Sequence, residues 1–202
     1  MLAAWVREFG HLVSSHTDRL NALDAAIGDA DHGTNLDRGF RAVVADLGTI
    51  ADPGTLLTHV GGTVVSKVGG AAGPLFGAFF LSLGDSLGHD PTVGAGRFAT
   101  GLRAGLAGVV ARGRAEAGDK TMYDALAPAI DAMGAIRDLP AMVQAGLRAA
   151  EAGRDATTGM LARKGRASYL GERSVGHQDP GATSAALLFT AAANALSPFG
   201  LE

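Results

Sequence analysis

The sequence predicts an all-α fold, an antiparallel up-and-down barrel or bundle of about eight helices. Apolar residues recur at intervals of three and four through most of the 202 residues, whereas period-two alternation is nearly absent. Hydrophobic residues make up 47% of the chain and charged residues 18%, which is typical of a globular protein with a sizeable core. We therefore expect residues 1–202 to form a single helical domain with short connections.

The amino-terminal half predicts four helices. Residues 2–13 and 36–47 each place apolar side chains on one helical face. Asp52 and Pro53 read as an N-cap and a proline at the first helical position, and so begin a helix over 53–68. A fourth helix begins near Gly73-Pro74 and runs to about Leu87. The side chains expected on the buried faces of the first three are Leu2, Trp5, Val6, Phe9, Leu12 and Val13, then Leu36, Phe40, Val43, Val44 and Leu47, then Leu56, Leu57, Val60, Val64, Val65 and Val68.

The carboxyl-terminal half predicts four more. The apolar residues of 98–110 form one face, and Thr121 is the expected cap of the next helix, which ends near Met133. Asp138 opens a helix through Leu147, and the last helix follows Pro180-Gly181 and runs to about Leu196. The longest non-periodic segment is 163–179, and a loop of that length in a compact domain is usually functional or mobile.

Composition excludes several classes of protein. The net charge of −3 and the pI of about 6.0 argue against a nucleic-acid binder, which usually presents a basic face. The chain has no cysteine, which excludes disulfides, thiolate catalysis and cysteine-bound zinc. No targeting segment is visible, and the most apolar stretch, 68–83, is short for a membrane span and broken by glycines. We expect a cytoplasmic protein with no membrane association; the tail 199–202 carries no signal.

The densest cluster of chemistry-bearing residues lies in 24–35. Asp24, Asp29 and Asp31 bring three carboxylates together with Gly28 and a second glycine. Carboxylate oxygens are hard ligands that suit Mg²⁺, and like charges this close repel unless a cation lies between them. The spacing does not match an EF-hand loop. The alternative interpretation is a set of solvated acids that cap helices.

Two further segments are candidates for binding an anion. Segment 69–77 is rich in glycine and enters a predicted helix, and free N–H groups before a helix start can cradle a phosphate. A close helix–helix crossing at these glycines is the alternative. Segment 163–183 clusters Arg163, Lys164 and Arg166, cations suited to phosphate oxygens, although such a loop is usually only solvated. The charged turn 112–122 read alone is a solvated connection. Together these segments suggest a helical Mg²⁺-nucleotide site used for phosphoryl transfer.

In this combination and order, the segments resemble the ADP-binding (L) subunits of dihydroxyacetone kinases over nearly the whole chain. The similarity is closest in 27–33, 113–122 and 163–183. The resemblance implies an antiparallel eight-helix barrel with the nucleotide at one end. It also implies that Asp24, Asp29 and Asp31 hold two Mg²⁺ ions, which in turn hold the phosphates of ADP or ATP.

The resemblance implies the remaining site residues as well. Arg166 is the candidate catalytic residue. The family often has serine where this chain has Ala72, so a hydroxyl is missing there while the backbone N–H remains. The implied nucleotide contacts are His32, Gly33, Thr34, Asn35, Gly70, Ala71, Ala72, Gly113, Met122, Arg166, Asp179, Pro180 and Gly181.

The resemblance further implies partners. In the phosphotransferase-linked form, ADP stays bound, a phosphohistidine carrier (M-type) subunit rephosphorylates it, and the γ-phosphate passes to dihydroxyacetone held by a separate K subunit. We favour this form because the chain has the length of an L module alone. A homodimer is a further expected assembly. The alternatives are an ATP-dependent L-type module, a nucleotide-binding regulator without turnover, and a helical interaction protein without a ligand.

Overall fold

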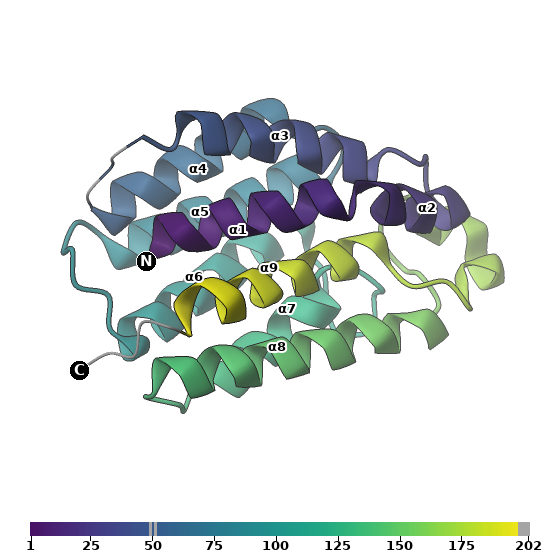
Figure 1. Cartoon of the computed structure of the whole chain (residues 1–202). Coiled ribbons are helices and arrows are strands. Elements are labelled where there is room, and N and C mark those ends of the chain that lie inside the picture. Colours follow the sequence, from purple (N-terminus) through teal and green to yellow (C-terminus); the bar gives the residue numbers. More distant parts are fainter. Residues whose placement is uncertain (49, 51, 198–202) are drawn as a thin grey trace.

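The computed structural model describes residues 1–48, 50 and 52–197, and within them every regular element is helical. Figure 1 shows long helices lying side by side. The elements are α1 (Leu2–Ser15), α2 (Thr17–Ile27), α3 (His32–Asp46), α4 (Pro53–Lys67), α5 (Ala72–Leu87), α6 (Ala95–Gly113), α7 (Tyr123–Met133), α8 (Leu139–Ala156), the 3₁₀ turns η1 (Thr157–Gly159) and η2 (Arg166–Ser174), and α9 (Pro180–Leu196).

Eight of the helices form a closed ring. From α3 to α9 each helix packs against the next, and α1 packs against both α3 and α9, which closes the circle (Figure 1). Helix α2 is extra to this ring and packs at one end against α3 and α9. The predicted all-α bundle is therefore confirmed.

Aromatic side chains fill the middle of the ring. Phe9 of α1 meets Phe40 of α3 edge to face at 4.6 Å between ring centroids, and Phe76 of α5 packs on both. Trp5 packs edge to face on Phe98, and its Nε1 donates a hydrogen bond to Leu188 O at 2.8 Å. Such edge-to-face contacts add stabilisation to the burial of apolar area. These contacts attach α1 to α3 and to α9, the two helices between which it closes the ring.

The predicted helix starts follow the expected capping chemistry. The carboxylates of Asp52, Asp138 and Asp179 each accept a hydrogen bond from a backbone N–H three residues later, with proline in the first turn of the helix. Thr121 lies two residues before α7, where its hydroxyl accepts a hydrogen bond from Tyr123 N. These four starts were placed correctly to within two residues.

Helix α2 is the main element that the sequence prediction missed. Its buried face consists of only Leu20, Asp24 and Ile27, so its apolar periodicity is weak. The structure ends α1 at Ser15 and continues almost at once into α2 after the non-helical residue His16.

Other boundaries and burial assignments also differ from the prediction. Helix α3 begins before the expected 36, α6 before the expected 98, and α8 continues beyond the expected 147. Part of the non-periodic segment 163–179 forms η2. Val44, Val65 and Val110 were expected on buried faces but are exposed, because each lies at the edge of its apolar stripe. The extent of the domain over 1–202 stays a prediction, and residues 49, 51 and 198–202, including the tail 199–202, lie outside the described residues.

Connections between helices alternate between the two ends of the ring. The α2–α3, α4–α5, α6–α7 and α8–α9 connections lie at one end, because successive long helices run in opposite directions (Figure 1). Segments that are far apart in the sequence therefore meet at that end. Among the described helices, none is both long enough and apolar enough to cross a membrane.

The crossing of α4 and α5 gives a stability prediction with an internal control. A Cβ at Gly61 would lie 2.8 Å from Leu81 N and 3.0 Å from Gly77 O, whereas a Cβ at Gly62 would meet nothing within 4 Å. We expect Gly61→Ala to lower the free energy of unfolding by about 1–3 kcal/mol through overpacking. Gly62→Ala should raise it by about 0.5–1 kcal/mol through lower backbone entropy in the unfolded chain. Urea denaturation of both variants measures the difference, and equal effects would contradict the close crossing.

Candidate metal and nucleotide site

A cavity of about 500 Å³ opens at the end of the ring where the four connections meet. Its walls come from the α2–α3 loop, the start of α5, the end of α6 with the loop that follows, and the segments before α9. All but two of the predicted site residues line it. Those that do are Asp24, Asp29, Asp31, His32, Asn35, Gly70, Ala71, Ala72, Gly113, Met122, Arg166, Asp179, Pro180 and Gly181.

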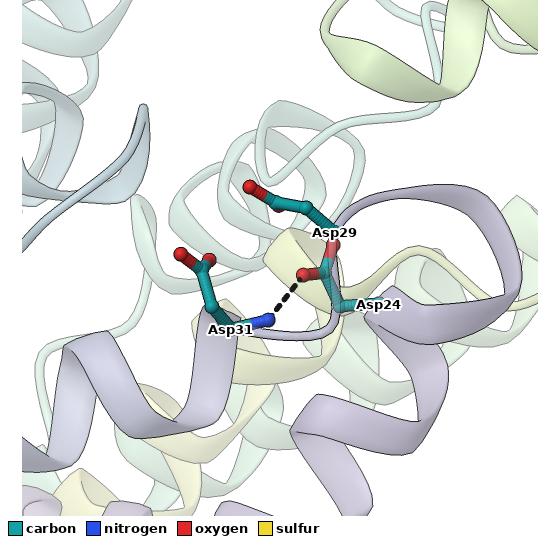
Figure 2. A group of neighbouring side chains, drawn as sticks. All are labelled: Asp24, Asp29 and Asp31. Carbon is teal, nitrogen blue, oxygen red and sulfur yellow. Dashed lines mark hydrogen bonds between the residues drawn. The ribbon is translucent and has the colours of Figure 1, made fainter.

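Three carboxylates form one wall of the cavity. One oxygen from each of Asp24, Asp29 and Asp31 lies within 4.8 Å of the others (Figure 2). Asp24 is buried, while Asp29 and Asp31 are exposed. Three oxygen donors at this spacing suit a hard cation such as Mg²⁺, and the two exposed carboxylates leave room for phosphate oxygens or water. The carboxylates therefore fit the predicted metal.

The position of Asp24 follows from the start of α3. Its Oδ2 accepts a hydrogen bond from Asp31 N at 2.9 Å (Figure 2) and a second one from His32 N at 3.3 Å. These N–H groups belong to the first turn of a helix, where they lack partners within the helix and carry partial positive charge. Asp24 thus caps α3 from α2, and its negative charge is stabilised without a metal.

The loop between Asp24 and Asp31 has an unusual backbone. Ala30 adopts a left-handed conformation with φ of 64°, which is costly for a residue other than glycine. A Cβ at Gly28 would lie 2.1 Å from Asp24 Oδ1, so any larger residue there would displace this carboxylate. The loop holds the aspartates together at the expense of local backbone strain.

A second part of the wall carries positive charge. Arg112, Lys164 and Arg166 line the cavity. A guanidinium nitrogen of Arg166 lies 2.9 Å from Asp29 Oδ2, with the side chains 68% and 37% exposed. An ion pair this exposed contributes only about 0–1 kcal/mol, so it exchanges readily for other partners.

A third part of the wall offers backbone donors. Helix α5 begins after Ala71 without a side-chain cap, and Gly70 has φ of +65°. Asn35 accepts a hydrogen bond from Arg38 through Oδ1 at 2.7 Å, with its Nδ2 on the side of Gly70. Free N–H groups at such a helix start favour an anion. The alternative interpretation also holds in part, because a Cβ at Gly77 of α5 would lie 3.2 Å from Gly61 O of α4.

Burial shifts the pKa of two groups at the cavity. It lowers the pKa of His32, outweighing the nearby Asp24 and Asp31, so this imidazole is neutral at pH 7; its Nε2 lies 3.0 Å from Ser184 Oγ. Burial also raises the pKa of Asp179 to about 7, against the hydrogen bond from Ala182 N and the attraction of Lys120. The aspartate cap of α9 is therefore the acid of this wall whose charge is most sensitive to pH near neutrality.

Gly33 and Thr34 are not part of the cavity wall. Gly33 packs against α2, where a Cβ would lie 2.2 Å from Thr17 O. Thr34 binds Asn21 through both its backbone N–H and its hydroxyl. Both residues hold α3 against α2, and so support the aspartate loop from behind.

Sequence reasoning missed several residues of the cavity wall. Lys120 lies in the charged turn that was read as a solvated connection, yet it is only 1% exposed. Its type and position carried no signal of burial. Several apolar residues of the wall were also missed, because apolar side chains on helices and in connections carry no signal that they face a ligand; they are Ile27, Leu75, Phe76, Val109, Ala115 and Ala167.

Comparison with known proteins gives consistent matches. The DAK2 domain matches residues 26–194. The ADP-binding subunit of the PEP-dependent dihydroxyacetone kinase of Escherichia coli is 44% identical over 186 residues, which is 89% of each chain. A counterpart from Listeria innocua is 43% identical over 93% of this chain and 91% of its own length.

Longer proteins also match. Rat triokinase/FMN cyclase is 34% identical over 86% of this chain and 31% of its own length. The crystal structure of the dihydroxyacetone kinase from C. freundii in complex with AMP-PNP and Mg²⁺ superposes with a TM-score of 0.74 at 31% identity. That match covers 96% of this chain, which spans about a third of the solved one.

The contact between Gly28 and Asp24 gives a prediction for metal binding. We expect Gly28→Ala to weaken binding of Mn²⁺, used as a probe for Mg²⁺, by about 10- to 100-fold, as the loss of a group that orients a metal ligand does. Gly94→Ala is the control, because a Cβ there meets nothing within 4 Å. Calorimetric titration of the nucleotide-free protein measures both; unchanged Mn²⁺ affinity in Gly28→Ala would contradict the role of Asp24.

Proposed function

The chain belongs to the DAK2-domain family, together with the ADP-binding subunits of dihydroxyacetone kinase, and we propose that it is the nucleotide-carrying subunit of such a kinase. It would bind Mg²⁺ with ADP or ATP and pass the γ-phosphate to dihydroxyacetone. The observation that carries this proposal is the aspartate trio, whose oxygens lie within 4.8 Å of one another at a cavity of about 500 Å³.

Each part of the cavity has a role in this proposal. Asp24, Asp29 and Asp31 would hold the metal, which supplies charge neutralisation for the phosphates. The N–H groups at the start of α5 would bind phosphate oxygens, and the apolar wall near Phe76 and Met122 would receive the base. In phosphoryl transfer of this kind the protein mainly positions the groups and neutralises charge.

We further propose that two Mg²⁺ ions bind, because three carboxylates exceed the one or two that a single Mg²⁺ usually takes from a protein. A K subunit would present dihydroxyacetone, and a phosphohistidine carrier would rephosphorylate ADP in place. Support for this form comes from the higher identity to separate PEP-dependent subunits, 44% and 43%, than to the longer triokinase, 34%. The homodimer and the cytoplasmic location stay predictions.

Replacing one metal ligand tests the proposal directly. We expect Asp29→Asn to stay folded but to raise the Kd for Mg-ADP by at least about 10- to 100-fold. Loss of a group that only orients a metal ligand weakens binding by that factor, and loss of the ligand itself should weaken it at least as much. Isothermal titration calorimetry measures the Kd, and thermal denaturation checks the fold. Asp85→Asn, a substitution in α5 outside the cavity, is the control. Normal ADP affinity in Asp29→Asn would sink the proposed function.

Arg166 tests the transfer step separately from binding. We expect Arg166→Ala to slow phosphoryl transfer roughly 100-fold and to weaken ADP binding less, because cationic donors matter most where charge shifts during reaction. Arg173→Ala is the matched control from the same η2 segment, outside the cavity. The assay mixes the chain with a K subunit and a phosphohistidine donor and measures dihydroxyacetone phosphate. Equal losses in rate and affinity argue against a catalytic role, and no product from the wild type would indicate a regulator without turnover.

A further inference from the structure

Lys120 is a buried lysine at the cavity whose ammonium group is already bound by the protein. Lys120 lies in the connection between α6 and α7 and lines the cavity, and it is only 1% exposed. Its Nζ donates hydrogen bonds to Thr157 O and His177 O. An ammonium group has three donors, and two are used here on main-chain carbonyls. Most of the donor capacity of Lys120 is therefore used by main-chain carbonyls of the protein itself.

The two carbonyls belong to the two ends of the connection between α8 and α9. Thr157 follows α8, and His177 lies two residues before Asp179, the N-cap of α9. The same junction has further contacts: Asp179 N donates to Thr157 Oγ1 at 3.0 Å, and Gly176 N donates to Thr158 O at 2.8 Å. Lys120 thus joins the turn before α7 to both sides of the α8–α9 connection.

The turn that carries Lys120 is itself held firmly. The carboxylate of Asp124 accepts hydrogen bonds from Gly118 N at 2.6 Å and from Thr121 N at 2.8 Å. Asp119 O accepts one from Arg163 N at 3.1 Å, which attaches the start of the basic segment to the same turn. The turn is therefore a fixed point to which Lys120 can tie other segments.

The backbone of Lys120 indicates that its side chain is needed there. Its φ is 63°, in the left-handed region that glycine or asparagine adopts more easily. Burial lowers the pKa of its ammonium group, while the charge of Asp179 opposes this shift. A strained backbone and a desolvated cation persist only where the surrounding contacts compensate for both.

We propose that Lys120 is a positioning residue that fixes the start of α9, and with it Asp179, Pro180 and Gly181, against the turn that carries Met122. Through this tie, two walls of the nucleotide cavity keep one relative position. The proposal rests on the proposed function only for the identity of the ligand, because the tie itself exists in the nucleotide-free protein.

The experiment compares Lys120→Met, which keeps the length of the side chain but removes its donors, with Lys67→Met as control. Lys67 lies at the end of α4 and outside the cavity. Amide hydrogen exchange of the nucleotide-free proteins is measured first. We expect Lys120→Met to exchange at least tenfold faster at the N–H groups of Arg163 and Gly176, with unchanged exchange at Ala141, which belongs to the cap of α8. Lys67→Met should leave all three unchanged.

Calorimetry with Mg-ADP and with Mn²⁺ alone then separates positioning from general damage. We expect Lys120→Met to raise the Kd for ADP at least tenfold while the Kd for Mn²⁺ alone changes less than twofold. Uniformly faster exchange, equal losses for ADP and Mn²⁺, or wild-type ADP affinity would each overturn the proposal. Failure of the wild-type protein itself to bind Mg-ADP would instead overturn the proposed function.

Should Lys120→Met not fold, Thr157→Val tests the same junction. This variant removes the hydroxyl that accepts a hydrogen bond from Asp179 N. We expect the same local increase in exchange at Gly176 and a smaller loss of ADP affinity, with Mn²⁺ binding unchanged. Unaltered exchange at Gly176 together with wild-type ADP affinity would overturn the proposal.

Discussion

Repulsion among three neighbouring carboxylates is the constraint to which one end of this protein is adapted. Two unit charges 4.8 Å apart, the limit for the aspartate trio, repel by roughly 3 kcal/mol at an effective dielectric constant of 20. The exposed ion pair between Arg166 and Asp29 offsets about 0–1 kcal/mol of this. The N–H groups at the start of α3 stabilise Asp24 but not the two exposed carboxylates. The remaining imbalance favours a divalent cation between them.

The ring of helices explains how this constraint can be met far from the core. Its aromatic centre stabilises eight helices independently of the loops, because the Phe9 and Trp5 contacts lie among helix faces. Loops at one end can therefore hold strained residues such as Ala30 and Lys120 without loss of the fold. Because the connections alternate between the two ends of the ring, four of these loops meet at one end. The site therefore forms from segments that lie far apart in the sequence.

Most of the ring could be predicted because its signals are local. Proline and aspartate pairs marked three helix starts, and apolar periodicity marked the faces of the long helices. Helix α2 could not be found this way, since its buried face includes Asp24. The site was predicted by residue type and by family resemblance, which place Gly33 and Thr34 beside the ligand. In the structure both contact α2, and their nucleotide contacts stay a prediction. Lys120 was missed because the partners that bury it are carbonyls more than thirty-five residues away.

The charged groups at the cavity divide by burial into two sets. Asp24 and Lys120 are buried, and each makes two hydrogen bonds to backbone groups of other segments. Breaking such a contact leaves a desolvated charge without a partner, so these residues hold fixed positions. Asp29 and Arg166 are exposed, and their ion pair costs little to separate. A site that receives both a cation and a polyanion needs this division. The buried charges maintain the geometry of the walls. The exposed charges can give up their contact with one another and bind a ligand instead.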